Sequence, residues 1–285
     1  MVRILASLVG AAFVFVLGLA LWGSVAGVIT DPAEHTAEQK YYHHPIDTHF
    51  QSDGMFGTFD ERQLQRGLQV FQEVCSACHS LRHVSFRDFA ALGYNEGQVK
   101  ALAAGWPIEQ PSVNGDTGEA ATRKNIPSDR VPSPYANETA ARAANNNAVP
   151  PDLSLMAKAR HDGTHYIYSL VGHGYVPQPA SLLREFPDAK TPKGLYFNQY
   201  FPNLNIAMPP PLKPDAQGNG PVKFADGTRS TVDQEAKDVA AFLTWTAEPK
   251  LETRHAAGLG AMLFLLIFTF LAWGAYQNVW RDIKH

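Results

Sequence analysis

Two long apolar runs stand near the two ends of the chain. The first extends from Ile4 to Thr30 without a charged residue and follows Arg3. Such a start predicts an export signal, and Ser24-Val25-Ala26 supplies a small-residue cleavage site. The run is also long enough to cross a bilayer uncleaved, so residues 1–30 are either a signal sequence or an N-terminal membrane anchor. It lacks the Arg- and Ser-rich character of a mitochondrial presequence, which indicates a bacterial protein.

The second run predicts a membrane-spanning helix over residues 255–280. Its charge-free part begins at Ala256 and, at about 1.5 Å per residue, exceeds a hydrocarbon core of about 30 Å. Trp273, Tyr276 and Trp280 form an aromatic belt at its far end. Arg281 and Lys284 follow, so residues 281–285 are expected in the cytoplasm. The residues between the runs are therefore expected on the periplasmic side of a bacterial inner membrane.

Between the runs, apolar residues recur with helical spacing. The clearest stripe lies in residues 61–78 and consists of Leu64, Leu68, Phe71, Cys75 and Cys78. It predicts a helix that ends at the two cysteines and carries them on its buried face. Shorter helices are predicted at 138–144 and 163–171. A last helix is predicted at 232–246, with Thr231 and Gln234 as a capping box.

The remaining segments favour loops. Residues 31–53 are polar and lack a clear period, so they predict an extended lead-in. Residues 105–151 and 177–192 predict loops, and 22 glycines and 20 prolines agree with long connections between helices. We therefore expect a mainly α domain over residues 54–250.

Charge and cysteine content exclude several classes of protein. The chain has 24 Lys and Arg against 27 Asp and Glu, whereas a nucleic-acid binder usually has a strong basic surplus. Its two cysteines both lie in the segment CSACH. A disulfide framework elsewhere is therefore impossible.

The segment CSACH predicts covalent attachment of one c-type haem. Two thiols one helical turn apart, Cys75 and Cys78, add to the two haem vinyl groups, and His79 then reaches the iron. A zinc site would need about four Cys or His ligands, and a second cysteine pair is absent. A thioredoxin-like pair would need a βαβ setting, which this Pro-rich chain does not show.

The sixth iron ligand decides what the haem does. A methionine raises the potential and closes the iron to exogenous ligands, which suits electron transfer. Met208 is the strongest candidate because three prolines follow it and stiffen its loop. The alternatives are Met55, Met156, His161, His165 and His173.

Arg160 and Tyr166 are candidate partners of the haem propionates. They lie between the two ligand motifs, and an arginine offers a bidentate fork to a carboxylate. On residue type alone, however, an arginine is more often exposed to solvent than bound to a propionate.

Four segments of the chain together resemble the cytochrome c1 family of cytochrome bc1 complexes. They are RGLQVFQEVCSACHSL, PYANETAARAANNNAVPPDLS, YFNQYFPNLNIAMPPPL and DVAAFLTWTAEPKLETRHAAG, and the resemblance extends from about Gly54 to the C-terminus. It implies covalent haem at Cys75 and Cys78, with His79 and Met208 as axial ligands. It also implies that Arg160 and Tyr166 contact the propionates.

Two features depart from the family pattern. Asn147 stands where the family commonly has glycine, so the backbone differs there or Asn147 adopts the left-handed conformation. Many members carry an additional disulfide, which two cysteines in CSACH cannot provide. Some other packing must then hold the region near Met208.

The resemblance implies a class I c-type cytochrome domain with long loop insertions and a C-terminal transmembrane helix. Its function would be to carry one electron at a time from the Rieske iron–sulfur protein to a soluble or membrane-anchored cytochrome c. The partners would include cytochrome b and the lipid membrane within a dimeric complex, without nucleic acid. Two alternatives are the haem subunit of another respiratory oxidase or reductase, and a haem protein with an open sixth site.

Overall fold

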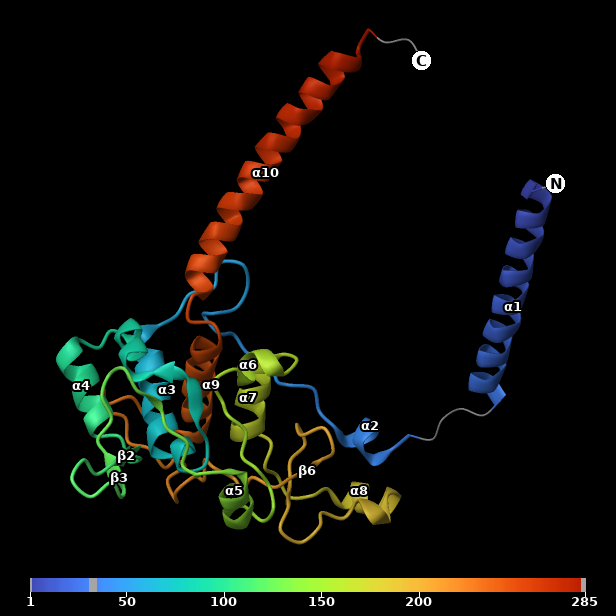
Figure 1. Cartoon of the computed structure of the whole chain (residues 1–285). Helices are drawn as coiled ribbons and strands as arrows, with labels where there is room; N and C mark the ends of the chain where they lie inside the picture. Colours follow the sequence, from blue (N-terminus) through green and yellow to red (C-terminus); the bar gives the residue numbers. More distant parts are fainter. Residues whose placement is uncertain (1, 31–34, 283–285) are drawn as a thin grey trace. The chain divides into compact units, whose positions relative to one another are not determined.

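The structure, a computed structural model, describes residues 2–30 and 35–282. Residues up to Tyr41 form one compact unit, and residues from Tyr42 onward form a second. The described chain is mainly α-helical, as predicted, and its strands form two-stranded antiparallel sheets (Figure 1). The elements of the second unit before α10 are α3 (Glu61–Glu73), a 3-10 turn (Cys75–Ala77), β1 (Leu81–Ser85), a 3-10 helix (Phe86–Leu92), α4 (Glu96–Ala104), β2 (Gln110–Val113), β3 (Ala120–Arg123), β4 (Arg130–Val131), α5 (Glu138–Ala144), α6 (Met156–Ala159), α7 (Gly163–Gly172), α8 (Ala180–Glu185), a 3-10 turn (Pro187–Ala189), β5 (Tyr196–Phe197), β6 (Asn205–Ile206) and α9 (Val232–Ala247).

The first unit contains α1 (Val2–Thr30) and the short helix α2 (Ala37–Tyr41). α1 is long and apolar enough to cross a membrane. A signal sequence and a membrane anchor share these properties. α2 lies within the predicted extended lead-in, of which residues 31–34 fall outside the described residues.

The core of the second unit is built around α3, α7 and α9. Asp60 caps the N-terminus of α3, because its carboxylate accepts hydrogen bonds from the backbone N–H groups of Arg62 and Gln63. α3 and α9 cross closely at Gly67, where a Cβ atom would lie 2.2 Å from the carbonyl oxygen of Asp238. Only glycine permits this approach. The aromatic side chains packed there are Phe71, Phe86, Phe89, Trp106, Phe242 and Trp245.

The last helix, α10 (Leu251–Trp280), is also long and apolar enough to span a membrane. Glu248 directly follows α9, and its carboxylate oxygens lie 2.8 Å from Nζ of Lys158 and 3.4 Å from Nε of Arg254. Buried Leu251 begins α10. Pro249 lies between α9 and α10, and ion pairs hold this junction. Lys284 lies outside the described residues.

Several local predictions need correction. The lead-in predicted to be extended contains α2, and the loop predicted at 105–151 contains the β2–β3 hairpin and β4. The α-helix predicted at 61–78 ends at Glu73; Cys75 begins a 3-10 turn, and Cys78 directly follows this turn. The predicted loop at 177–192 contains α8, which is too short for helical periodicity to reveal and buries only Leu182. At α9, Thr231 accepts the N–H of Gln234, but the Gln234 side chain donates to Asp238 instead of completing a capping box.

Candidate functional site

The CSACH motif follows directly from the end of α3. In the 3-10 turn, the backbone N–H groups of Cys78 and His79 both donate to the carbonyl oxygen of Cys75, at 3.1 and 2.9 Å. Both thiols are free and partly buried. Burial raises the pKa of the Cys75 thiol to about 12, and the negative charges of Cys78 and Glu235 add to this. The Cys75 thiol is therefore protonated at neutral pH.

His79 is held in one orientation by the backbone. Its Nδ1 lies 2.7 Å from the carbonyl oxygen of Pro151, so the neutral ring donates its Nδ1 proton there and carries a lone pair on Nε2. Burial lowers the pKa of His79, although the Pro151 hydrogen bond and the charge of Asp152 oppose this shift. The result is a neutral imidazole with Nε2 available to a metal, which is the arrangement that metal-binding histidines usually show.

Asp152, next to Pro151, ties this loop to the motif. Its Oδ2 accepts hydrogen bonds from the Ser80 hydroxyl and the Arg82 N–H, both at 2.7 Å, and its Oδ1 accepts from the Ser154 N–H at 3.0 Å. Burial alone would raise the pKa of Asp152, but these hydrogen bonds outweigh it and lower the pKa. Asp152 therefore fixes the carbonyl that orients His79.

The segment before Pro151 covers the second cysteine. The Tyr135 side chain lies near the side chains of Cys78 and Asn145, close enough for both to affect its pKa. Asn147 has φ +64°, so of the two alternatives for this position the structure shows the left-handed conformation. The Arg142 guanidinium donates to its carbonyl oxygen at 3.1 Å.

The Met208 segment follows β6 and is held without a disulfide. The Tyr175 hydroxyl donates to the Met208 carbonyl oxygen at 3.1 Å. Buried Asn198 ties the β5–β6 hairpin together, because its N–H donates to Leu204 and its side-chain amide to Leu170 in α7. These contacts supply the alternative packing that the absent disulfide requires.

The structure brings Arg160 and Tyr166 together. Burial raises the pKa of Tyr166, and the nearby Arg160 side chain opposes this shift. The Tyr166 and Tyr175 phenols are close enough for charge on one to raise the pKa of the other. Since Tyr175 also contacts Met208, these residues form one connected cluster.

A hydrogen bond joins the loop that carries Pro151 to the segment before β5. The Asn146 amide donates to the Gly194 carbonyl oxygen at 3.3 Å, two residues before β5. A Cβ atom on Gly194 would lie 2.4 Å from the same amide. The loop carrying Pro151 and the hairpin preceding Met208 therefore pack against each other.

The competing sixth ligands have other surroundings. Met55 is 58% exposed, and Met156 packs against the core. The remaining candidates are three histidines with their own partners: His161 lies 2.9 Å from Asp162, His165 lies 2.8 Å from the Thr48 carbonyl oxygen, and His173 lies 3.0 Å from Asp233. Within residues 2–30 and 35–282, no cluster of three or more His, Cys, Asp or Glu side chains could hold a bare metal ion.

Comparison with known proteins identifies the family. The profile of the Cytochrome C1 family matches residues 50–283. The chain belongs to the cytochrome c1 family. It is 46% identical over 241 residues to Cytochrome c1 of Rhodospirillum rubrum, covering 81% of this chain and 86% of that protein. It is 41% identical over 271 residues to the mitochondrial Cytochrome c1 1, heme protein, of Arabidopsis thaliana, covering 94% and 80%.

A third relative has a composite name. Cytochrome b/c1 of Bradyrhizobium diazoefficiens is 42% identical over 246 residues, which cover 80% of this chain and 34% of that protein. Cytochrome c1 family proteins are electron-transfer subunits of bc1 complexes and carry a covalently bound haem c. The comparisons do not favour the alternative of an oxidase or reductase subunit.

The donor set fits this cofactor, since the thiols are free and His79 presents Nε2. Sequence reasoning missed Tyr135, Pro151, Asp152 and Tyr175, which hold the candidate residues in place. Their signals are weak because two of the contacts use backbone carbonyls, which any residue could supply.

Proposed function

We propose that the chain relays single electrons from the Rieske iron–sulfur protein to a soluble or membrane-anchored cytochrome c within a cytochrome bc1 complex. The observation that carries this proposal is the hydrogen bond between His79 and Pro151, which prepares Nε2 as an iron ligand beside two free thiols. Haem c supplies the one-electron redox chemistry, and the protein supplies position and electrostatics.

Cys75 and Cys78 are the residues that hold the haem covalently, and His79 and Met208 are its axial ligands. The Pro151 carbonyl keeps the His79 ring in place. Tyr175 holds the Met208 backbone in place. Binding of the weak thioether ligand to iron then requires little further loss of conformational entropy. A His and Met pair raises the potential and closes the iron to exogenous ligands.

Arg160 and Tyr166 are the partners of the haem propionates. A buried carboxylate needs hydrogen bonds or an opposite charge. The neighbouring Arg160 and Tyr166 side chains offer both, and Tyr166 lies near Tyr175, which contacts Met208.

Helix α10 supports the proposed placement in the membrane. Its length and apolar character fit a membrane anchor. Arg281 after the aromatic belt favours a cytoplasmic C-terminus and a periplasmic haem domain. The relative named Cytochrome b/c1 supports cytochrome b as a partner, and the working unit is a dimeric complex.

Replacement of the proposed sixth ligand tests this function. Met208→Leu should lower the haem midpoint potential markedly, because the choice of axial ligands changes haem redox potentials over a range of about 0.8 V. It should also let carbon monoxide bind rapidly to the reduced protein and slow quinol-driven haem reduction in membranes. Met55→Leu, at an exposed methionine, is the matched control and should leave all three readouts unchanged.

An unchanged potential in Met208→Leu would contradict the ligand assignment. Rapid carbon monoxide binding to the unmodified protein would favour the alternative of an open sixth site. A haem that quinol cannot reduce in intact membranes would contradict the place of the chain in the bc1 complex.

A further inference from the structure

The loop between Gln51 and Thr58 presents two large apolar side chains to the outside. Met55 is 58% exposed and Phe56 is 76% exposed. Among the large apolar residues described between α2 and α10, Phe56 is the most exposed. Such a pair in contact with water is unfavourable, because burying each side chain would be stabilising.

The root of this loop is tightly built. The Thr58 N–H donates to the Gln51 carbonyl oxygen at 2.8 Å. The Asp53 carboxylate turns back and accepts the Phe50 N–H at 2.8 Å. At Gly57, a Cβ atom would lie 2.2 Å from the Ser52 carbonyl oxygen, so the two arms meet there.

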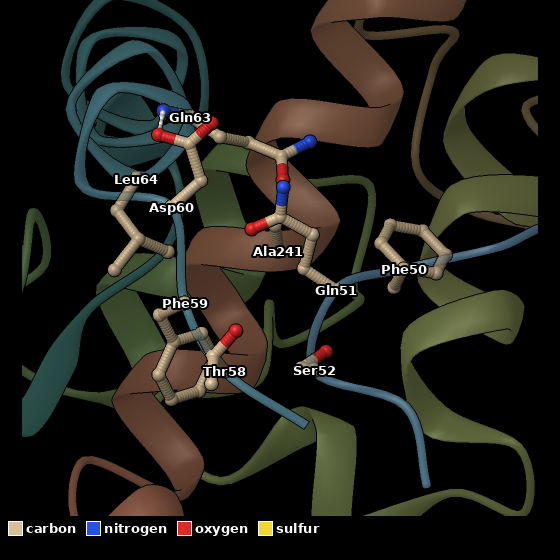
Figure 2. A pocket seen from close by; sticks show the side chains of 9 residues that line it. All are labelled: Phe50, Gln51, Ser52, Thr58, Phe59, Asp60, Gln63, Leu64 and Ala241. Carbon is tan, nitrogen blue, oxygen red and sulfur yellow. Dashed lines mark hydrogen bonds between the residues drawn. The ribbon is translucent and has the colours of Figure 1, made fainter. Parts of the chain in front are cut away.

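Figure 2 shows the same root from close by. Ser52 and Thr58 lie on neighbouring arms, beside Leu64 of α3 and Ala241 of α9. The arms are thus fixed on the helical core. The exposure of Met55 and Phe56 at the tip is therefore a property of an ordered loop.

The loop is joined to the first turn of the membrane helix. The Phe59 N–H donates to the Glu252 carboxylate at 2.8 Å. The charge-free part of α10 begins four residues after Glu252, which is about 6 Å along a helix axis. Figure 1 shows the loop beside the beginning of α10.

These distances place the tip near the membrane surface. Phe56 is three residues from Phe59, and a chain of that length reaches about 10 Å. The headgroup layer on each side of the hydrocarbon core is several ångströms thick. The tip can therefore enter this layer when α10 spans the bilayer.

We propose that the 51–58 loop is a second membrane contact, with Met55 and Phe56 inserted among lipid headgroups and upper acyl chains. The inference rests on the anchoring of the chain by α10. The tip suits a lipid surface because the tip is small, apolar and free of charge. The one carboxylate of the loop, that of Asp53, is turned away from the tip and accepts the Phe50 N–H. Shallow insertion of apolar side chains is how interfacial segments bind membranes.

Two contacts with the bilayer would restrict how the haem domain tilts about the junction between α9 and α10. The junction itself is held by Glu248 and its cationic partners. The 51–58 loop would add a second contact with the membrane, made by a segment far in sequence from this junction.

Spin labelling of the full-length, haem-loaded chain in phosphatidylcholine liposomes tests the proposal. A nitroxide is attached at Phe56→Cys, and its collisions with oxygen and with a water-soluble nickel complex are measured. The label should collide mainly with oxygen and lose most of its nickel collisions relative to Val113→Cys. Val113 is a suitable reference because it is 66% exposed and lies in the β2–β3 hairpin.

A label at Leu265→Cys, in the middle of α10, reports independently on membrane insertion. If Leu265→Cys is lipid-exposed while Phe56→Cys collides with nickel as often as Val113→Cys, the loop is in water and the proposal is wrong although the anchoring stands. The same labels are then measured in the assembled complex. Loss of collisions with both reagents at Phe56→Cys would mean that a protein partner covers the loop, which would also overturn the proposal.

Discussion

The Nδ1 atom of His79 lies 2.7 Å from the carbonyl oxygen of Pro151, a residue 72 positions later in the chain. This contact joins the end of α3 to the loop before α6. It fixes the tautomer of the imidazole and leaves Nε2 without its proton. The geometry of the proposed iron ligand therefore depends on a loop that has no regular secondary structure around Pro151.

The loop depends in turn on Asp152. Asp152→Ala should lower the free energy of unfolding by about 1.5–3 kcal/mol, the contribution of hydrogen bonds to a charged group. The His79 ring would then lose its fixed partner, so the low-spin haem spectrum should become heterogeneous. Chemical denaturation and absorption spectra check both effects, and Asp116→Asn, at an exposed position, should change neither.

The pH dependence of this effect has a definite sign. Hydrogen bonds lower the folded-state pKa of Asp152 despite its burial. Its stabilisation is therefore complete above the unfolded pKa of about 4 and is lost as the pH falls through the folded value. The difference between the unmodified protein and Asp152→Ala should shrink in acid, and a constant difference from pH 3 to 7 would contradict this account.

The close crossing of α3 and α9 gives a second prediction. Gly67→Ala places a Cβ atom against the Asp238 carbonyl oxygen and the Phe242 side chain. We expect a loss of about 1–3 kcal/mol, typical of overpacking, seen as a lower melting temperature of the haem-loaded protein. Gly115→Ala is the matched control because nothing lies near its Cβ position. Equal melting temperatures for both variants would show that the crossing adapts.

The sequence predicted the parts of this molecule that have a local signature. CSACH indicates haem chemistry because its residues act together within one turn, and the stripe from Leu64 to Phe71 indicates a buried helix face. The charge-free run that begins at Ala256 indicates a membrane helix through its length and apolar composition. Each of these depends on residue type and spacing alone.

What remained hidden depends on contacts between distant segments. The partner of His79 is a backbone carbonyl, and the Tyr175 contact with Met208 spans 33 positions. Arg160 and Tyr166 are expected at the propionates chiefly through resemblance to a family, and no pattern in the sequence indicates that the two side chains lie together. α8 is shorter than two helical turns, so its few apolar residues could not establish a period.

The buried ion pair between α3 and α9 gives a third prediction. Asp238 has a fully buried side chain, and its Oδ2 lies 2.7 Å from Nε of Arg66. Burial raises the pKa of Asp238, although Arg66, Gln63 and Gln234 oppose the shift. Arg66→Met should cost about 3 kcal/mol, near the lower end for an unpaired buried charge, because both glutamines still donate hydrogen bonds.

A second substitution separates loss of charge pairing from loss of packing. Asp238→Asn in the Arg66→Met background removes the unpaired charge and should recover part of the stability. Urea denaturation of the single and double variants gives the coupling energy. If the changes in unfolding free energy of the two single variants simply add in the double variant, Arg66 and Asp238 have no specific interaction energy.

Glu235 gives the last prediction, because its buried carboxyl group is only half satisfied. Oε1 accepts hydrogen bonds from the Val222 N–H and the Ser230 hydroxyl, whereas Oε2 has no hydrogen-bond partner among the described residues. Gly220 lies so close that a Cβ atom there would be 2.3 Å from Cδ of Glu235. Burial raises the pKa of Glu235, and the charges of Glu73 and Asp238 add to this while its hydrogen bonds oppose it.

A carboxyl group with a raised folded-state pKa destabilises the protein increasingly as the pH rises above the unfolded value of about 4.3. Glu235→Gln removes this titration and resembles the protonated group in shape. The variant should therefore gain stability relative to the unmodified protein between pH 4 and 7, and the two should converge in acid. Thermal denaturation across this range measures the difference. Glu96→Gln should change stability in the opposite direction, since the Lys100 hydrogen bond lowers the pKa of Glu96; a pH-independent difference for Glu235→Gln would show that Glu235 is not the titrating group.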